Sequence, residues 1–274
     1  MANEPITVSV VIATRDRPEL LRDALASVAA QSHPPLEVLI ADDRDTSASP
    51  PPPAESVSRD VWAIAADPSL ALLAIRVLRS GGVGVAAARN RAAREAGGVV
   101  LAFLDDDDRW HPEHLTGLAA AFIDPAVEVA FRDSVVIHER VAVDGCRVDV
   151  EARTIAHDWN AEVMGRDDFV APSALAVRRE SFVALGGFDE GFRYSEDWDF
   201  LLRAARRAAP RRVEGVTAEV RMRATGHLSQ DDGAERVACL SRLAARHGLA
   251  PIAVKTFWEV AECIDSGPPG ADVR

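Results

Sequence analysis

Four consecutive aspartates, Asp105–Asp108, are the residues of this chain whose types and spacing point most directly to chemistry. They follow the apolar run GGVVLAFL and precede RWHPEHL, so they occupy the end of a predicted strand. Two carboxylates about 5 Å apart repel each other by roughly 1 kcal/mol in water and by several times more at a partly buried site. A divalent cation usually offsets that cost. The alternative, a solvated turn that caps the next helix, would use one carboxylate and leave three unexplained.

Two further acidic groups lie near predicted element ends. Asp42 and Asp43 end another predicted strand, and the run Glu196-Asp197-Trp198-Asp199 begins a predicted helix, where the helix dipole favours an ionised carboxylate. Open parallel sheets bind ligands at the carboxyl ends of their strands. We therefore expect the strand-end acids to form one site, in which the first pair binds a base and ribose and Asp105–Asp108 bind a metal-bound diphosphate.

The elements that must position these acids alternate strands with helices in the first half of the chain, which predicts an α/β fold with a mostly parallel sheet. A capping box at Asp16 and Glu19 predicts a helix over Pro18–Gln31. The glycines of Gly81–Gly84 precede another helix but lack the spacing of a dinucleotide-binding loop. The predicted strands of this half are Thr7–Ala13, Leu36–Ala41, Ile75–Arg79 and Val99–Leu104.

Beyond the aspartates the pattern changes to α+β, with a hairpin predicted around Asp144-Gly145. The predicted strands are Val127–Phe131, Ser134–Glu139, Val141–Val150 and Ser173–Arg178. The predicted helices are Pro112–Ile123, Glu180–Leu185, Ser195–Ala209, Ala234–His247 and Pro251–Ile264.

The composition narrows the classes of partner. With 274 residues, 48% of them hydrophobic, the chain can bury the core of one large domain. A net charge of −12 disfavours nucleic acid as a partner. The chain has no secretory signal pattern and no apolar run near the ~20 residues that span a bilayer. We therefore expect a cytoplasmic protein with no integral membrane segment, and we leave a homodimer open.

Four stretches, in this order, resemble family 2 glycosyltransferases of the GT-A fold, in the nucleotide-diphospho-sugar transferase superfamily. They are SVVIATRDRPELLRDALASVAAQ, LEVLIADD, GVAAARNRAAREAGGVVLAFLDDDDRWHPEHL and ALGGFDEGFRYSEDWDFLLRAA. The resemblance implies a doubly wound, mostly parallel central sheet with a small antiparallel element and C-terminal helices. It also implies transfer of a sugar from a nucleotide diphosphate donor to an acceptor hydroxyl or amine, usually with inversion and with bound Mn²⁺ or Mg²⁺.

The resemblance also implies a domain organisation. Residues 1–220 would form the catalytic domain, with a nucleotide-sugar-binding half over 1–110 and an acceptor-binding half over 111–220. A flexible proline-rich loop would cover 46–58. Residues 221–265 would form a loop and helices packed on the same domain, and 266–274 a disordered tail.

The resemblance assigns the donor-binding residues by motif position. Ala13 and Thr14 would line the base pocket and Asp43 would contact the base. Asp107 would be the direct metal ligand, while Asp105 would contact the ribose or the metal.

For several other residues the resemblance implies a supporting role or leaves two roles open. Asp106, at the variable place of the motif, and Asp108 would be supporting charges near the donor. Arg89, with Asn90, would either contact the donor or form a structural pair. His227 would either reach the metal or be an ordinary loop histidine.

On the acceptor side, Asp197 would be the general base, since a positioned carboxylate typically contributes ~10²–10⁴-fold to such a proton transfer. Glu196 would touch the acceptor. Trp198 would be part of the core or of the acceptor wall, and Asp199 with Arg203, at i,i+4 spacing, would form a helix-surface pair.

Two departures from the family pattern leave the donor base open. The chain has Ala13-Thr14-Arg15-Asp16 in place of the usual Pro-Thr-Tyr-Asn, and Asp42-Asp43-Arg44-Asp45 in place of Asp-Asp-Gly-Ser. The donor could thus be linked to UDP, GDP or TDP, and the acceptor could be a small molecule, a peptide or an oligosaccharide. Two other functions remain as alternatives. One is a non-catalytic nucleotide-sugar-binding relative. The other is a sugar-phosphate nucleotidyltransferase, which should have a glycine-rich loop where this chain has ATRDRPE.

Overall fold

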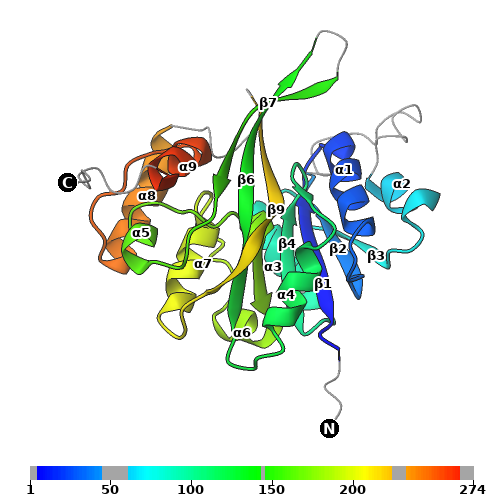
Figure 1. The fold of residues 1–274 in the computed structure, drawn as a ribbon, viewed down its shortest axis with the longest axis horizontal. Helices are drawn as coiled ribbons and strands as arrows, with labels where there is room; N and C mark the ends of the chain where they lie inside the picture. Colours follow the sequence, from blue (N-terminus) through cyan, green and yellow to red (C-terminus); the bar gives the residue numbers. More distant parts are fainter. Residues whose placement is uncertain (1–4, 45–60, 143–145, 224–232, 266–274) are drawn as a thin grey trace.

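The computed structural model describes residues 5–44, 61–142, 146–223 and 233–265. Within these ranges one mixed sheet of nine strands runs through the molecule in the order β3-β2-β1-β4-β8-β6-β9-β5, and β7 pairs with β6 (Figure 1). The strands are β1 (Val8–Thr14), β2 (Glu37–Asp42), β3 (Ile75–Arg79), β4 (Val100–Asp105), β5 (Arg109–Trp110), β6 (Val129–Val141), β7 (Arg147–Ile155), β8 (Leu175–Arg178) and β9 (Arg211–Arg223). The α-helices are α1 (Pro18–Ala29), α2 (Val61–Ala65), α3 (Val85–Glu95), α4 (His114–Ala121), α5 (Ala161–Met164), α6 (Arg179–Ala184), α7 (Glu196–Ala205), α8 (Ala234–His247) and α9 (Phe257–Asp265).

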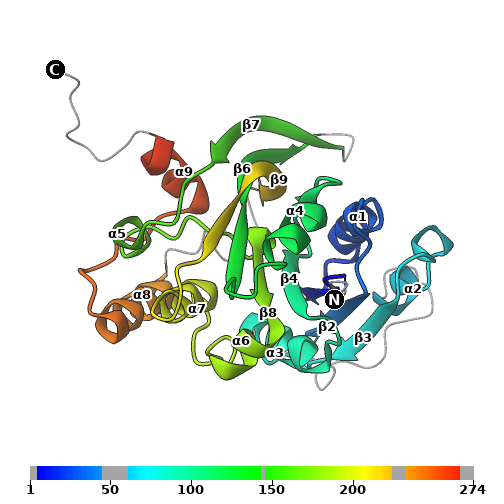
Figure 2. The same ribbon diagram turned by 60° about the horizontal axis from the view of Figure 1, so that its bottom comes forward.

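The first four strands, β1 to β4, form the parallel part of the sheet. Because side chains alternate between the two faces of a strand, β1 contributes Val11 to one core and Val10 and Ile12 to another. The Val11 core includes the alanines of α3, and the other core includes Leu21 of α1. The two helices therefore cover opposite faces of the sheet, as Figure 2 shows. The predicted doubly wound, mostly parallel arrangement is confirmed here.

The sheet becomes antiparallel at β8, which pairs with β4 on one side and β6 on the other. The predicted hairpin is present, with β6 and β7 antiparallel and projecting from the body of the molecule (Figure 1). The two predicted strands Val127–Phe131 and Ser134–Glu139 are in fact one strand, β6. The small antiparallel element of the prediction is confirmed, but it is larger than expected.

Strand β9 has no counterpart in the sequence prediction, and it pairs in parallel with β6 along most of its length. The pairing register shifts on both sides of Asp133 in β6, opposite Gly215 of β9, which has a left-handed φ of 108°. Such a bulge interrupts the alternation of apolar residues by which a strand is recognised in a sequence. Because β9 continues to Arg223, residues 221–223 belong to the sheet and not to the predicted loop. The predicted loop 46–58 and tail 266–274 lie outside the described residues.

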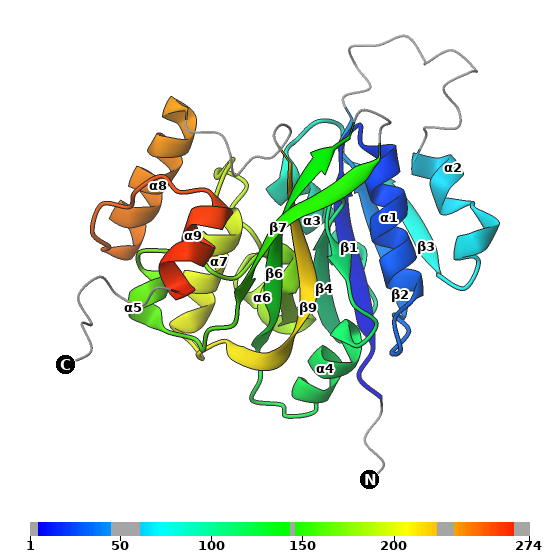
Figure 3. The same cartoon turned by 45° about the horizontal axis from the view of Figure 1, so that its top comes forward.

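Of the C-terminal helices, α9 packs on β6 and β7, and α8 lies beside α7 (Figure 3). Trp258 of α9 stacks on His138 of β6, with ring centroids 3.9 Å apart. His247, at the end of α8, lies 2.9 Å from a carboxylate oxygen of Asp199 in α7. Asp199 also pairs with Arg203 at 2.8 Å, so the predicted pair forms, but Asp199 is fully buried and does not lie on the helix surface.

Candidate active site

The four aspartates turn their carboxylates to two different sides of the strand end. Oxygen atoms of Asp105, Asp107 and Asp108 all lie within 4.8 Å of one another. The side chain of Asp106 turns away and is fully buried, accepting a hydrogen bond from the Thr14 hydroxyl at 2.6 Å. Thr14 and Asp106 therefore support the strand end from behind, and neither is among the residues that line the pocket. The donor-binding roles of Thr14 and Asp106 stay predictions.

Asp108 is fixed by residues from the far half of the chain. The Ser173 hydroxyl donates to one of its carboxylate oxygens at 2.6 Å, and the backbone N–H of Arg221 donates to the other at 2.9 Å. The backbone N–H of Asp105 donates in turn to the Ser173 oxygen at 3.0 Å. Ser173, directly before β8, thus holds both ends of the acidic run.

The electrostatics of the run fit a bound cation. Burial raises the pKa of Asp106 to about 7, with Arg17 opposing the shift and Asp107 adding to it. Burial, and then the charges of Asp107 and Asp105, raise the pKa of Asp108 well above its usual range. Three converging carboxylates supply the hard oxygen ligands that Mn²⁺ and Mg²⁺ take. Asp105, Asp107 and Asp108 could therefore hold a divalent cation. The third predicted ligand, His227, lies outside the described residues.

Two arginines that sequence reasoning missed contact the run. Arg17, at the start of α1, reaches Asp107 at 2.8 Å and Asp106 at 2.6 Å. Arg223, at the end of β9, reaches the same oxygen of Asp107 at 2.7 Å. Although burial lowers the pKa of Arg17, the charges of Asp107, Asp106 and Asp105 raise it overall. These arginines supply positive charge beside the predicted metal ligand.

Arg89 of α3 connects the acidic run to the start of α7. Its buried guanidinium contacts Asp105 on one side and lies 2.5 Å from Glu196 on the other. Of the two roles considered for Arg89, the structure shows the pairing. Asn90 is a structural residue, because its side chain both donates to and accepts from the backbone of Phe188 at 2.8 and 2.9 Å.

The predicted base contact, Asp43, holds the loop that leads into α3. Its two carboxylate oxygens accept hydrogen bonds from the backbone N–H groups of Val83 and Gly84, both at 2.9 Å. Gly84 has a φ of 98°, a conformation that favours glycine. Ala13 lines the pocket at the end of β1. A direct contact between either residue and a base stays a prediction.

Glu196 and Asp197 begin α7, after a Ser195 in the left-handed region at φ 64°. Burial raises the pKa of Glu196 to about 7, with the charge of Asp197 adding to the shift and Arg89 opposing it. Burial also raises the pKa of Asp197. Asp197 accepts a hydrogen bond from the backbone N–H of Trp198 at 2.9 Å. The Trp198 ring is buried and donates to the Met164 carbonyl at 2.6 Å, and Trp198 also lines the pocket.

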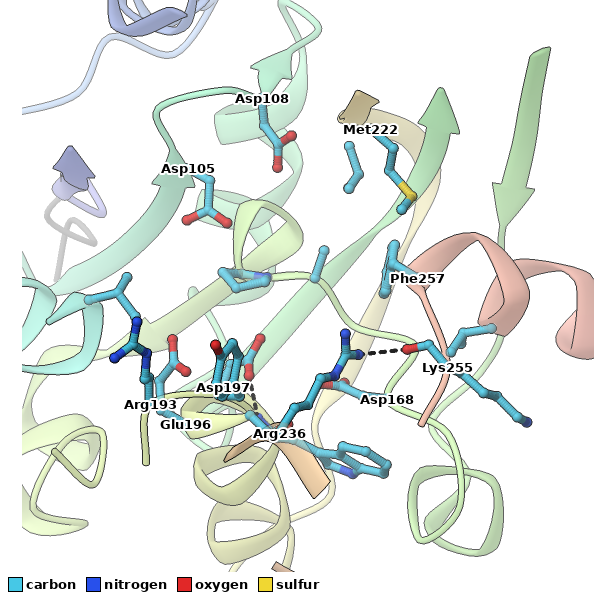
Figure 4. A pocket seen from close by; sticks show the side chains of 18 of the residues that line it. Asp105, Asp108, Asp168, Arg193, Glu196, Asp197, Met222, Arg236, Lys255 and Phe257 are labelled. Carbon is cyan, nitrogen blue, oxygen red and sulfur yellow. Dashed lines mark hydrogen bonds between the residues drawn. The ribbon is translucent and has the colours of Figure 1, made fainter. Parts of the chain in front are cut away.

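A cavity of about 250 Å³ brings these groups together. Asp105, Asp107, Asp108, Glu196 and Asp197 all line it. In Figure 4, Asp105 and Asp108 lie at one end of the view, and Asp168, Arg236 and Lys255 lie at the other.

The other end of the cavity was not predicted from the sequence. It is lined by residues of α8 and α9 and by the segment before β8. Arg236 of α8 donates to the Lys255 carbonyl at 2.6 Å, and the Lys255 ammonium lies 2.5 Å from Asp167. Burial, and then the charge of Asp197, raise the pKa of the neighbouring Asp168 well above its usual range. The Asp167-Asp168 pair before an apolar run was the one signal in the sequence that could have indicated these residues.

Comparison with known proteins agrees with the motifs. Residues 9–143 match the family model described as Glycosyl transferase family 2. The chain is 30% identical over 256 residues to an uncharacterized glycosyltransferase of Bacillus subtilis, YwdF, with 93% of this chain and 89% of that protein covered. It is also 30% identical over 199 residues to the O-antigen biosynthesis protein RfbC of Myxococcus xanthus, covering 72% of this chain and 14% of that protein.

Solved structures share the fold. The chain matches residues 1–349 of S. aureus TarS, in complex with UDP-GlcNAc, with a TM-score of 0.60 and 20% identity over 88% of this chain and 66% of that chain. A longer TarS structure matches with a TM-score of 0.56 and 19% identity, covering 39% of that chain. The sheet and the C-terminal helices are thus those of the GT-A fold, and the chain belongs to glycosyltransferase family 2 and is a glycosyltransferase.

Proposed function

We propose that this glycosyltransferase is metal-dependent and moves a sugar from a nucleotide diphosphate sugar to an acceptor hydroxyl or amine by a single inverting displacement. The observation that carries the proposal is the shared cavity. The carboxylates that could hold a cation and the carboxylate of Asp197 line one pocket. A leaving diphosphate and an attacking acceptor can therefore meet at one sugar.

At the donor end, Asp105, Asp107 and Asp108 would hold Mn²⁺ or Mg²⁺. A bound cation would stabilise the negative charge that develops on the leaving diphosphate. Ala13 and Asp43 would lie beside the base, and Asp105 beside the ribose. The TarS complex with UDP-GlcNAc supports a UDP-sugar as the first donor to test, with GDP- and TDP-sugars next.

At the acceptor end, Asp197 would act as the general base. The acceptor oxygen or nitrogen would form a bond to the anomeric carbon as its proton passes to the Asp197 carboxylate. The bond from that carbon to the phosphate oxygen would break, and a nucleoside diphosphate would leave. The raised pKa of Asp197 suits proton uptake, because a base works best with a pKa near the operating pH. Glu196 would contact the acceptor and hold Arg89 against Asp105.

Release of nucleoside diphosphate tests this proposal. Purified protein with Mn²⁺, a UDP-sugar and a panel of sugar, peptide and small-molecule acceptors should release UDP. Asp197→Asn should lower that rate by about 10²–10⁴-fold while UDP binding persists. Asp158→Asn is the matched control, since the Asp158 side chain is 85% exposed and lies outside the pocket lining. Equal rates in Asp197→Asn and the wild type would move the base elsewhere. Nucleotide binding without turnover across the UDP, GDP and TDP donors would favour the non-catalytic alternative.

A further inference from the structure

One carboxylate oxygen of the central metal-site residue is shared by two arginines. Oδ2 of Asp107 accepts from Nη1 of Arg17 at 2.8 Å and from Nη2 of Arg223 at 2.7 Å. The arginines come from opposite ends of the chain, one from the start of α1 and the other from the end of β9. Charge-assisted bonds of this kind are among the stronger ones in proteins. A cation that binds Asp107 must therefore share this carboxylate with two positive charges or displace them.

Each arginine has a second carboxylate to which it can turn. Arg17 already contacts Asp106 through its other terminal nitrogen, at 2.6 Å. Arg223 lies 3.6 Å from Oε1 of Glu139, which is too long for a hydrogen bond. That oxygen is buried and accepts no hydrogen bond from the residues that the structure describes. Loss of Asp107 would thus leave neither guanidinium without an acid. Glu139 Oε1 would gain a hydrogen bond, while its Oε2 keeps the one from Arg221 at 2.8 Å.

The two arginines differ in their freedom to move. The side chain of Arg223 is 12% exposed, whereas that of Arg17 is 36% exposed and lines the cavity. A diphosphate beside Asp107 would offer Arg17 new oxygens while Asp106 still holds it. Arg223 is mostly buried at the end of β9, and Glu139 Oε1 lies 3.6 Å from its guanidinium.

We propose that Arg17 and Arg223 act as resident counter-cations that hold Asp107 until the metal and the nucleotide diphosphate arrive together. In the loaded site Arg17 contacts the diphosphate and Arg223 moves onto Glu139. The inference rests on the proposed function for the place of the metal and the diphosphate. Its consequence is that Mn²⁺ binds the free protein weakly, and that a nucleoside diphosphate strengthens its binding.

Electron paramagnetic resonance of free Mn²⁺ measures this directly, in the full chain and without any transfer reaction. Arg223→Gln removes one competing charge, and the Mn²⁺ affinity without nucleotide should rise about tenfold, as expected for the loss of one charge-assisted contact. Arg17→Gln should also raise it, but here added UDP should give little further gain because the diphosphate has lost its arginine. Arg15→Gln is the matched control. Arg15 is exposed, and its substitution removes the same charge two residues away from Arg17.

A third variant tests the destination of Arg223. Glu139→Gln should leave Mn²⁺ binding to the free protein weak and should reduce the gain that UDP brings, because the amide carries no charge with which to attract Arg223. Thermal unfolding of each variant identifies any that is misfolded, and either arginine variant suffices for the main comparison.

The outcomes separate the two proposals. Unchanged Mn²⁺ affinity in the folded arginine variants, or a rise equal to that of Arg15→Gln, overturns the counter-cation role and leaves metal-dependent transfer standing. A wild type that binds no Mn²⁺ even with UDP present overturns both. A wild type that binds Mn²⁺ with UDP but transfers no sugar overturns the proposed function alone.

Discussion

The two ends of the cavity balance their charge in different ways. At the end of the acidic run every carboxylate has a protein partner. Asp105 contacts Arg89, Asp106 contacts Thr14 and Arg17, Asp107 contacts Arg17 and Arg223, and Asp108 contacts Ser173 and the backbone of Arg221. At the other end, Asp168 accepts a hydrogen bond from the Val170 N–H at 3.3 Å, and no arginine or lysine described in the structure pairs with it.

The difference indicates that arginines balance the charges of Asp105, Asp106 and Asp107 before a ligand binds, whereas the charge of Asp168 must be neutralised by a proton or by a ligand. The first arrangement suits a highly charged ligand that exchanges ionic partners. The second suits a ligand with its own hydroxyl or amino group. Single substitutions test this contrast.

Arg89→Met should cause the largest loss of stability, because it removes the guanidinium that pairs Asp105 with the buried Glu196. Breaking a buried ion pair from one side costs about 3–5 kcal/mol. Urea unfolding followed by circular dichroism measures the change in the free energy of unfolding. A loss below about 1 kcal/mol would mean that the donor end does not depend on its internal ion pairs.

Glu196→Gln should flatten the dependence of stability on pH. The folded pKa of Glu196 is about 7, against about 4.3 for an unfolded chain. Between about pH 4 and pH 7 the unfolded chain releases this proton while the folded protein keeps it, so wild-type stability should fall as the pH rises. The fall should be smaller in the variant by an amount on the order of 4 kcal/mol. Glu180→Gln, at an exposed position of α6, is the control, and equal pH profiles for all three proteins would contradict the buried environment of Glu196.

Asp168→Asn and Asp167→Asn should change stability in opposite directions at pH 8. Asp167 is held by Lys255 at 2.5 Å and by Arg166 at 2.9 Å, so its neutralisation should cost about 1 kcal/mol. Neutralising Asp168, whose pKa burial raises, should instead stabilise the protein by about 1 kcal/mol. Thermal unfolding of the neighbouring pair gives the comparison. Destabilisation by both changes would show that the far end is also balanced by its own residues.

Arg22→Gln should have the smallest effect. Arg22 pairs with Glu19 on the exposed surface of α1 at 2.9 Å, and such pairs contribute about 0.3–0.5 kcal/mol. Urea unfolding should thus barely distinguish this variant from the wild type. A larger loss would mean that arginine contacts outside the cavity also matter, which would weaken the contrast drawn within it.

The parallel half of the fold could be predicted because its information is local. The strands β1, β2, β3 and β4 are apolar runs that lie within one residue of their predicted ends, and α1 begins at the predicted Pro18. Strand β9 could not be found in this way, since its bulges at Gly215 break the alternation that a sequence pattern needs. Helix α9 begins at Phe257, six residues after the predicted start at Pro251.

The same division applies to the site. Asp105, Asp107 and Asp197 stand in continuous motifs, and the structure brings them to one cavity. Arg17 and Arg223 were missed because their partner Asp107 lies 90 and 116 residues away along the chain. Asp168 and Lys255 were missed for a similar reason, since their proximity depends on the packing of segments far apart in the sequence.

The contacts of Ser173 and Arg221 with Asp108 have a consequence for the order in which the protein is made. The acidic run precedes β8 and β9 in the sequence, and domains fold as the chain is synthesised from its N-terminus. The hydroxyl and the backbone N–H that fix the run are added 65 and 113 residues later. A nascent chain that already carries all four aspartates therefore cannot yet hold them in place. The enzyme should acquire its capacity to capture a charged donor only after β8 and β9 have been synthesised and have joined the sheet.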